Sequence, residues 1–466
     1  MNNILLKRKN IIDKIILIKN KYSKNLPLKI YNKKINYDTD SWFSAEKIKT
    51  EKTVNMISYT KKFPDTIISS QKIKIIFNMN QKEIINSWFN AHTKMYNITL
   101  KYIYKNYPMI HNTTLLSKFL LENKIYSGSS NKIEFTNFIY LRKQLLAEKK
   151  EIQKDSQLKI STNTKIHIHV LDYAIKQVCS NLKSTISNFI NGHIKRFRIK
   201  LWKSNRISKS LDIEPQNIKN NNLFAKLIGT VKYKYNNKFY NLPKINTNIK
   251  INYNRHTNEY YLLIPKENKP TNLNNKKINI IVLDPGLRTF MTGLSNKSAV
   301  KIGINVNNII AKKIETLNKI KNNINIPNKI KKKNELLINQ KIENKIDDLH
   351  WKTISFLTTN YNNILLGDMS AKSIVKKTSS ILSANMKSAC LRTCYYKFQQ
   401  RLAYKCNLTK TNFSLVNEMY TSKICSNCCN YNEKLSKEKI YDCVNCKLTI
   451  DRDINACRNI FFKSLI

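Results

Sequence analysis

Hydrophobic positions in the first half of the chain change several times between a helical and a strand-like period. A short strand-like run begins at Ile67 and is followed by apolar residues at helical spacing, which predict a strand and then a helix. These helical positions are Ile84, Ile85, Trp88, Phe89, Met95 and Ile98. Residues 133–200 are also mainly helical in pattern. Residues 223–265 alternate apolar and polar positions between turn signals, which predicts antiparallel strands.

The second half carries three strand-like runs, of which the first two are nearly continuous apolar stretches typical of strands buried on both faces. The runs are INIIVLDPG at 278–286, NNILLGD at 362–368 and FSLVNE at 413–418. Residues 307–360 have a Lys-rich helical pattern that Pro327 interrupts, which predicts two helices folded back on each other with mostly solvated lysines. Another helix is predicted from 381 to 406.

Changes in composition divide the chain into three parts. Residues 1–66 are basic and irregular, and we interpret them as an N-terminal extension of unknown role. A polar, Asn-rich linker from Glu267 to Lys277 precedes the first buried strand. We therefore expect one region at 67–276 and a second at 277–466.

The balance of charges indicates a polyanionic partner. The 466 residues include 83 Lys and Arg against 30 Asp and Glu, a formal net charge of +53. Biased base composition of the gene is an alternative explanation, because Lys, Asn and Ile are abundant. That bias explains the choice of Lys over Arg, but less easily the shortage of acids. Nucleic acid is the expected partner.

Several classes of protein are excluded by features that the sequence lacks. No apolar run approaches the roughly 20 residues that cross a bilayer, so neither a membrane span nor a secretory signal is expected. Six of the ten cysteines lie in the last 42 residues at metal-like spacing, which favours a reducing compartment over a disulfide framework. None of the seven glycines belongs to a Walker-type phosphate loop, which removes the main support for a kinase or motor.

A basic segment at 193–209 has two interpretations. Seven Lys or Arg residues are interleaved there with Phe197 and Trp202. Such a segment can bind phosphates while its aromatic rings stack on bases. It is equally compatible with a solvated helix face that carries two core aromatics, and the sequence does not decide between the two.

The cysteine spacing near the C-terminus predicts a structural zinc ribbon. Cys425 and Cys428 form one CxxC pair, and Cys443 and Cys446 form a second after fourteen intervening residues. Four thiolates complete a tetrahedral shell, so this Zn²⁺ should hold the fold and leave no position for catalysis. A deaminase is excluded because no HxE triplet precedes the pairs. Cys429 has no partner at ligand spacing and is interpreted as an ordinary thiol.

Four carboxylates stand where predicted elements end or begin. Asp284 closes the first buried strand, Asp368 ends the second, Glu418 ends the third run, and Asp453 begins an apolar helix. Alone, Asp284 is more often a turn former and Asp453 a helix N-cap. Together, in so basic a protein, they indicate oxygen ligands for divalent metals at a phosphate.

These same residues resemble a known family. The motifs DPGLRTFMTG, GDMSAKSI, NEMYTSKICSNC, CVNC and DRDINACRNI are similar, in order and spacing, to the RuvC-like nuclease half of transposon-encoded TnpB proteins and their eukaryotic and viral relatives, the Fanzor proteins. The resemblance covers 277–466. Upstream, residues 81–100 and 241–266 resemble the guide-binding regions of that family more weakly, and residues 1–66 match no family.

The resemblance implies an α+β multidomain fold. A RuvC/RNase H-like α/β nuclease domain at 277–466 would contain an inserted zinc ribbon at 420–447. A β-barrel-like wedge region and a helical recognition region would precede it at 67–276. The implied activity is that of a transposon-encoded, RNA-guided DNA endonuclease with a guide RNA and a double-stranded DNA target as partners. It would act in the nucleus if the host is a eukaryote or its virus, and otherwise in the cytoplasm or nucleoid.

The family also implies roles for individual acids. The first acid of the site is the Asp of DPG, here Asp284, and the last is the Asp of RDxNA, here Asp453 and not Asp451. Most TnpB proteins carry Glu where this chain has Asp368, whereas Fanzor-like members place a Glu before TSKxC, here Glu418. The resemblance thus implies two-metal hydrolysis with catalytic Mg²⁺ on Asp284, Glu418 and Asp453, and Asp368 as a weaker alternative to Glu418.

Two departures from the family and two rival functions accompany this interpretation. Cys429 stands where relatives usually have Gly, and Cys457 stands where Ala is common, but the ribbon ligands are intact.

One rival function is that of a cleavage-dead, RNA-guided DNA-binding protein, against which the retained acids argue. The other is an RNA-independent RuvC-like transposase or resolvase, which would purify without RNA.

Overall fold

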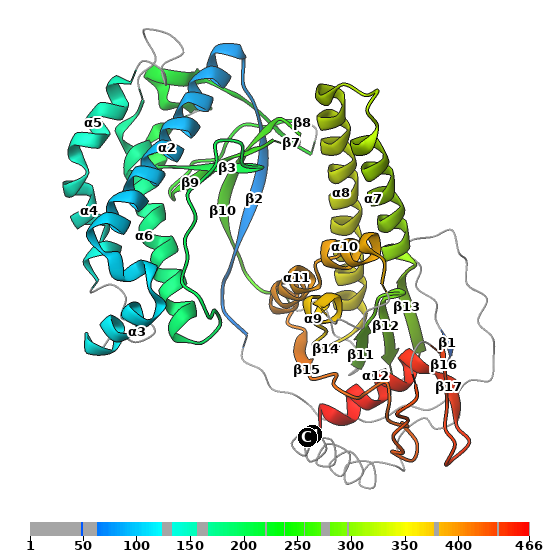
Figure 1. The fold of residues 1–466 in the computed structure, drawn as a ribbon. Coiled ribbons are helices and arrows are strands. Elements are labelled where there is room, and N and C mark those ends of the chain that lie inside the picture. Colours follow the sequence, from blue (N-terminus) through cyan, green and yellow to red (C-terminus); the bar gives the residue numbers. More distant parts are fainter. Residues whose placement is uncertain are drawn as a thin grey trace. The chain divides into compact units, whose positions relative to one another are not determined.

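The computed structural model describes residues 48–49 and 63–465, except for 124–132, 156–165, 220, 237, 256, 272–279, 296–297, 377–381 and 436–437. The chain forms two compact units (Figure 1). The N-terminal unit is Ile68–Lys266, and the C-terminal unit is Glu267–Ile466 together with Met1–Ile67. Most of the expected extension at 1–66 lies outside the described residues.

An open sheet of six strands, in the order β3-β9-β10-β2-β7-β8, is the frame of the N-terminal unit. A three-stranded sheet, β4-β5-β6, accompanies it. The strands are β2 (Ile67–Ile76), β3 (Ser208–Ile213), β4 (Ile218–Lys219), β5 (Asn222–Leu223), β6 (Gly229–Thr230), β7 (Lys232–Tyr235), β8 (Lys238–Phe239), β9 (Ile249–Asn254) and β10 (Glu259–Asn268). The antiparallel strands expected at 223–265 are present. The expected barrel-like closure is not formed by the described residues, because the edge strands β3 and β8 do not pair with each other.

The helix predicted after Ile67 is the longest of the N-terminal unit. Its start is fixed by a capping box, in which Asn78 Oδ1 accepts the Gln81 N–H at 2.8 Å and the Asn78 N–H donates to Gln81 Oε1 at 3.1 Å. Its apolar face, including Trp88 and Tyr96, is buried in the core. The helices are α2 (Met79–Asn106), α3 (Thr113–Glu122), α4 (Phe138–Gln144), α5 (Leu146–Lys154) and α6 (Ile168–Ile190).

The basic segment 193–209 contains no helix, and all of its residues are described. Its two aromatic rings are packed inside the unit. Trp202 stacks on Tyr96 with ring centroids 3.6 Å apart, and the Arg206 guanidinium lies over Trp202 at 3.5 Å from its centroid. Phe197 is buried. The structure therefore favours the interpretation that the two aromatic residues pack against the core, over the interpretation that they stack on bases. The helix that the first interpretation assumed is absent, because the segment is irregular.

A second six-stranded sheet, in the order β1-β13-β12-β11-β14-β15, is the frame of the C-terminal unit. The first four strands pair antiparallel, whereas β11, β14 and β15 run parallel. The strands are β1 (Ile48–Lys49), β11 (Ile280–Pro285), β12 (Thr289–Ser295), β13 (Ser298–Ile304), β14 (Asn363–Gly367) and β15 (Asn412–Val416). A separate hairpin is formed by β16 (Ile440–Asp442) and β17 (Thr449–Asp451).

Helices cover both faces of this second sheet, so β11 and β14 are buried as predicted. Ile281 and Leu283 of β11 pack in one cluster with residues of α7, α8, α10 and α11, and Ile280 and Val282 pack against α12 on the other side. The helices are α7 (Val306–Asn322), α8 (Asn328–Asn360), α9 (Ala371–Lys376), α10 (Ala384–Arg392), α11 (Tyr395–Leu408) and α12 (Arg452–Lys463). Helices α7 and α8 fold back on each other, as predicted, and Pro327 precedes α8 (Figure 1).

The helix expected from 381 to 406 is two helices, which is a correction to the sequence-based prediction. The chain breaks between α10 and α11 at Cys394, whose φ of 51° is left-handed. The buried Thr393 hydroxyl bonds Asn307 Oδ1 and the Ala389 carbonyl there. The periodicity of hydrophobic residues within 381–406 does not reveal this break, because the bond joins Thr393 to a residue far away in the sequence.

In the part of the chain that the structure describes, no helix combines the length and apolar character needed to span a membrane.

Candidate functional site

Four cysteine sulfurs meet at the turn that joins β16 to β17. The sulfurs of Cys425, Cys428, Cys443 and Cys446 all lie within 4.8 Å of one another. The Cys425 and Cys446 sulfurs are 3.6 Å apart, and those of Cys428 and Cys443 are 3.4 Å apart. A set of four converging thiols fits a single tetrahedral Zn²⁺ that leaves no open position.

The two CxxC turns share one backbone pattern. In each turn the amide of the first cysteine donates to a carbonyl five residues later, and the residue after the second cysteine donates back to the first cysteine. The bonds are Cys425 N to Asn430 O (2.8 Å), Cys429 N to Cys425 O (3.0 Å), Cys443 N to Leu448 O (2.9 Å) and Lys447 N to Cys443 O (2.9 Å). Cys429 and Lys447 both have left-handed φ angles, of 62° and 57°. This explains why Gly suits the position of Cys429.

Two buried asparagines of α12 fasten the first CxxC turn. Asn455 Oδ1 accepts the Ser426 N–H at 2.9 Å, and its Nδ2 donates to the Ile424 carbonyl at 2.8 Å. Asn459, one helical turn later, donates to the carbonyls of Thr421 and Ile424 at 2.8 and 2.7 Å. Sequence reasoning did not identify these residues. Their i, i+4 spacing within an apolar helix was the available signal.

The acid Asp284 lies at the carboxyl end of β11, where the parallel register sets the neighbouring ends. Leu283 pairs with Leu366 of β14, and Leu366 pairs with Leu415 of β15. Asp284, Asp368 and Glu418 therefore follow three adjacent strands at one edge. Burial raises the pKa of Asp284 well above its usual value, and the charges of Asp453 and Glu418 raise it further against the opposing Arg452.

Glu418 directs its carboxylate into the same region. Burial raises the pKa of Glu418 to about 7, the charge of Asp368 adds to the rise, and Lys463 opposes it. Glu418 Oε2 is buried and has no hydrogen-bond partner within the described protein. It lies where a side chain on Gly367 would be, because a Cβ built there would be 2.8 Å from Oε2.

Asp368 has a different position from Glu418. It is exposed, its N–H donates to the Val416 carbonyl at 3.0 Å, and its Oδ1 accepts the backbone N–H of Glu418 at 3.0 Å. The carboxylate of Asp368 thus fixes the backbone from which Glu418 projects.

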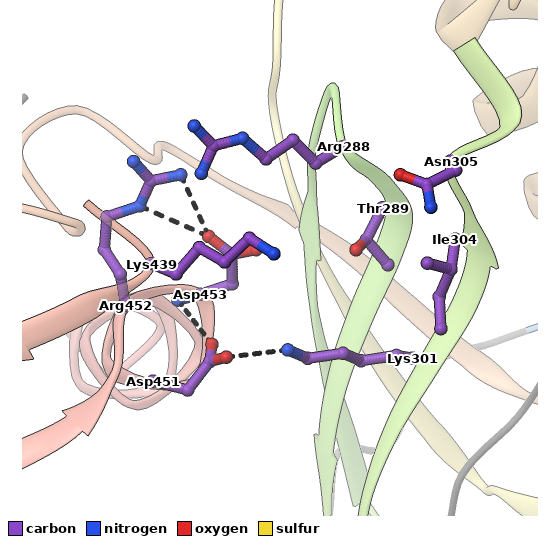
Figure 2. Close-up of a pocket in the computed structure, with 9 residues that line it drawn as sticks. All are labelled: Arg288, Thr289, Lys301, Ile304, Asn305, Lys439, Asp451, Arg452 and Asp453. Atoms are coloured by element: carbon purple, nitrogen blue, oxygen red, sulfur yellow. Dashed lines mark hydrogen bonds and ion pairs between the residues drawn. The ribbon is translucent and has the colours of Figure 1, made fainter. Parts of the chain in front are cut away.

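Asp453 lies in the first turn of α12, but it does not cap that helix. The N-cap is Asp451, whose Oδ1 accepts the N–H groups of Asp453 (2.9 Å) and Ile454 (3.2 Å). Asp451 also bonds Lys301 at 2.6 Å. The capping alternative for Asp453 is therefore wrong. Asp453 Oδ1 accepts from Nε and Nη2 of Arg452 at 3.3 and 3.2 Å (Figure 2).

The acids lie in one region of the C-terminal unit, but their carboxylate oxygens do not converge on a single position where an ion could be held. Among the described His, Cys, Asp and Glu side chains, the four cysteines are the group whose ligand atoms converge closely enough to hold an ion. Asp453 is paired with Arg452, and Glu418 lies against Gly367. Burial raises the pKa values of Asp284 and Glu418 and neighbouring carboxylates raise them further, so both carboxylates would be stabilised in the ionised form by a cation, and Glu418 Oε2 has no hydrogen-bond partner within the described protein.

Two further residues support Asp284, and the sequence analysis linked neither of them to it. The Tyr395 hydroxyl donates to the Gly286 carbonyl and holds the turn after Asp284. Cys457, which is fully buried on α12, donates to the Thr292 carbonyl on the strand paired with β11 at 3.3 Å. Both were hard to find because each acts through a residue far away in the sequence.

The Asn455→Ala substitution should loosen the cysteine module. It leaves the Ser426 N–H and the Ile424 carbonyl without the Asn455 side chain, a cost of about 2 kcal/mol. We expect faster zinc loss to a chromogenic chelator than in the wild type. The control is Asn445→Ala, an exposed position in the second CxxC turn. Equal release rates for the two variants would show that α12 does not hold the module.

The raised pKa of Glu418 predicts a pH-dependent gain in stability for Glu418→Gln. A folded-state value of about 7 against 4.5 means that Glu418 contributes stability below pH 4.5, which is lost as the pH rises through 7. Without added divalent ions, the free energy of unfolding of the variant relative to the wild type should therefore increase by roughly 2–3 kcal/mol between pH 5 and pH 8. The measurement is the difference in Tm between the two proteins across this pH range.

Gly367→Ala supplies the check on this assignment. The new Cβ should push the Glu418 carboxylate toward solvent and lower its pKa. The Tm of Gly367→Ala should therefore depend less on pH than the Tm of the wild type, as is also expected for Glu418→Gln. A Tm difference between wild type and Glu418→Gln that stays constant with pH would contradict the buried position of Glu418.

A family model matches the C-terminal part of this chain. Residues 395–460, which include the four cysteines and Asp453, match the family described as Cas12f1-like, TNB domain. A Cas12f1 chain solved in a complex with single-guide RNA and target DNA aligns with 84% of this chain and 98% of its own, at 13% identity. Its TM-score of 0.30 is too low to assign a fold.

Relatives match along nearly the whole chain. Two TnpB-like proteins of Acanthamoeba polyphaga mimivirus are each 32% identical to it over 444 residues, which cover 93% of this chain. The same alignments cover 78% and 79% of the two relatives. The chain therefore belongs to the TnpB-like family.

Proposed function

We propose that this protein is an RNA-guided DNA endonuclease, whose C-terminal unit is a RuvC/RNase H-like nuclease domain with an inserted zinc ribbon. The observation that carries the proposal is that the charges of Glu418, which follows β15, and of Asp453, in the first turn of α12, both act on Asp284 at the end of β11. The three acids come from segments on both sides of the cysteine module. The TnpB-like relatives and the sheet of antiparallel and parallel strands support it.

The substrate is a nucleic acid that a strongly basic protein attracts. A net charge of +53 favours phosphate backbones irrespective of sequence. In the proposed function, a guide RNA pairs with one strand of a double-stranded DNA target and supplies the sequence specificity. The N-terminal unit would serve as the wedge and recognition region that holds the guide, and the range proposed for it is 67–276.

Two kinds of metal fit the donors that this chain offers. The four cysteines would hold a structural Zn²⁺, because thiolates are its preferred ligands. Asp284, Glu418 and Asp453 offer the carboxylate oxygens that Mg²⁺ prefers. When bound, Mg²⁺ stabilises the charge that develops at a phosphate and lowers the pKa of water.

The acids differ in what they do within this site. Burial raises the pKa of Asp284, and the charges of Asp453 and Glu418 raise it further, so a bound cation would favour the ionised form of Asp284. Glu418, with a pKa of about 7, gives up its proton near neutral pH and then offers its orphaned oxygen. Asp368 is a positioning residue, since its carboxylate holds the Glu418 backbone. Arg452 forms an ion pair with Asp453, and a bound cation would compete with Arg452 for the Asp453 carboxylate.

Substitutions of these acids should separate ligands from positioning residues. Asp284→Asn, Glu418→Gln and Asp453→Asn should each lower the rate of Mg²⁺-dependent DNA cleavage roughly 1000-fold, or about 4 kcal/mol, because each removes a charged ligand. Asp368→Asn should lower it at least tenfold less than Glu418→Gln. Binding of target DNA should persist in all four variants. A larger loss of cleavage in Asp368→Asn than in Glu418→Gln would show that Asp368, and not Glu418, is the metal ligand between Asp284 and Asp453 in the sequence.

The guide is tested by the nucleic acid that accompanies the protein. We expect one RNA species to co-purify with the full chain, and sequencing that RNA should identify a segment that directs cleavage of matching DNA. A protein that cuts DNA without RNA would indicate a resolvase or transposase. A complex with RNA that binds matching DNA without cutting it would indicate a guided binding protein.

A further inference from the structure

The turn at 286–288, which joins β11 to β12 just after Asp284, is bonded to other elements at each of its three carbonyl oxygens. The bonds run from the Tyr395 hydroxyl to Gly286 O, from Asn307 Nδ2 to Leu287 O (2.8 Å) and from Asn305 N to Arg288 O (2.7 Å). Tyr395 begins α11, Asn307 belongs to α7, and both side chains are buried. The turn itself is partly to fully exposed, so these bonds anchor it from the core.

The side chain of Asn307 uses both ends of its amide. Its Nδ2 donates to the Leu287 carbonyl, and its Oδ1 accepts from the Thr393 hydroxyl. Asn307 is 1% exposed, so water does not compete for these two bonds. Because Thr393 lies at the break between α10 and α11, Asn307 connects the turn after Asp284 to that break.

Thr393 is held in turn by His350 of α8. Arg401 Nη1 lies 3.2 Å from His350 Nδ1, and His350 Nε2 lies 3.0 Å from the Thr393 carbonyl. A guanidinium can only donate, so Nδ1 is the acceptor and the ring proton is on Nε2, which donates to Thr393. Asp347 accepts from Arg401 at 2.8 Å. The position of Thr393 beside Asn307 is therefore fixed by a continuous set of bonds.

The ring and the hydroxyl of Tyr395 are also fixed. Phe290 of β12 stacks on Tyr395 with ring centroids 5.3 Å apart, and on His350 with centroids 5.5 Å apart. Burial raises the pKa of Tyr395 above its usual value, and nearby acidic groups, Asp284 among them, raise it further. The hydroxyl thus keeps its proton and donates it to the Gly286 carbonyl.

The backbone that carries Asp284 needs such an anchor on one side. The parallel pairing of β11 with β14 ends at Leu283, whereas the antiparallel pairing with β12 continues, with Asp284 opposite Thr292. Among the described strands, β12 alone accompanies Asp284. The bonds to the turn supply the second restraint, and Pro285 transmits it because its ring fixes φ.

The other two acids of the candidate site are held differently. Glu418 Oε2 has no hydrogen-bond partner within the described protein, and Asp453 is in an ion pair with Arg452. Since the carboxylate oxygens do not converge, these two side chains must move for one ion to contact all three acids. A site that closes around one fixed carboxylate loses less conformational freedom on binding.

We propose that Asn307 and Tyr395 are positioning residues that hold Asp284 as the fixed ligand around which the candidate cation site closes. This inference rests on the proposed function. Neither residue contacts the ion, and both act through the turn at 286–288. Bonds that orient a ligand in this way raise the affinity of a site for its metal.

The test is Mn²⁺ binding to the full chain with its co-purified RNA, counted by electron paramagnetic resonance, with Tm measured for every variant. Tyr395→Phe removes the hydroxyl and keeps the ring. The matched control is Tyr361→Phe, because Tyr361 packs in the same core cluster but its hydroxyl bonds Ser295 and Ser298 at the opposite end of β12. The Mn²⁺ that is lost in Glu418→Gln defines the ion held by the acids and not by RNA.

Tyr395→Phe and Asn307→Ala should each raise the dissociation constant of that Mn²⁺ about tenfold. Tyr361→Phe should leave it unchanged, although Tm falls in all three variants. Thr393→Val, which removes the hydroxyl that orients Asn307, should also weaken Mn²⁺ binding, and Thr393→Ser should keep the affinity of the wild type.

Wild-type affinity for Mn²⁺ in either Tyr395→Phe or Asn307→Ala would overturn the inference and leave the cation site standing. Equal weakening in Tyr361→Phe would also overturn it, because the effect would then follow general loss of stability. If Glu418→Gln binds as much Mn²⁺ as the wild type, the acids hold no cation, and this inference fails together with the proposed function.

Discussion

The parallel register of β11, β14 and β15 is the constraint on which the candidate site depends. Because Leu283, Leu366 and Leu415 lie side by side, the residues that follow them emerge at one edge of the sheet. Packing on both faces leaves little freedom for these strands to shift. Burial at this edge raises the pKa values of Asp284 and Glu418, and repulsion from neighbouring carboxylates raises them further. The fold holds this unfavourable arrangement in place, and a cation would relieve it.

Helix α12 connects this edge to the cysteine module. One side of the helix packs on β11 through Cys457 and Ile460, and its first turn presents Asp453. Asn455 and Asn459 bind the backbone of the first CxxC turn. The module and the acids are therefore parts of one packed assembly, in which a structural metal would fix the segment between the last two acids.

The sequence was informative where the chemistry is local. Cysteine spacing identified the four thiols that converge, apolar runs identified β11 and β14, and Pro327 marked the turn between α7 and α8. Each of these signals is complete within a few residues. The motif around Asp453 also distinguished it from Asp451, and the capping role of Asp451 is consistent with that distinction.

Features that depend on distant residues were missed. The break at Cys394 depends on a bond from Thr393 to Asn307, and Trp202 is covered by Tyr96, about a hundred residues away in the chain. The open sheet of the N-terminal unit also depends on which strands pair, and an alternation pattern within one strand does not specify its partner. The role of Asp368 as support for the Glu418 backbone became visible only through a contact between two neighbouring strand ends.

The central claim is that Asp284, Glu418 and Asp453 together form a divalent-cation site. Manganese binding to the RNA-bound protein, counted by electron paramagnetic resonance at neutral pH, tests it most directly, with zinc content measured in parallel. The account predicts that Glu418→Gln loses at least one bound Mn²⁺ per chain while its zinc content is unchanged. Equal manganese stoichiometry and affinity in the wild type and the variant would contradict it.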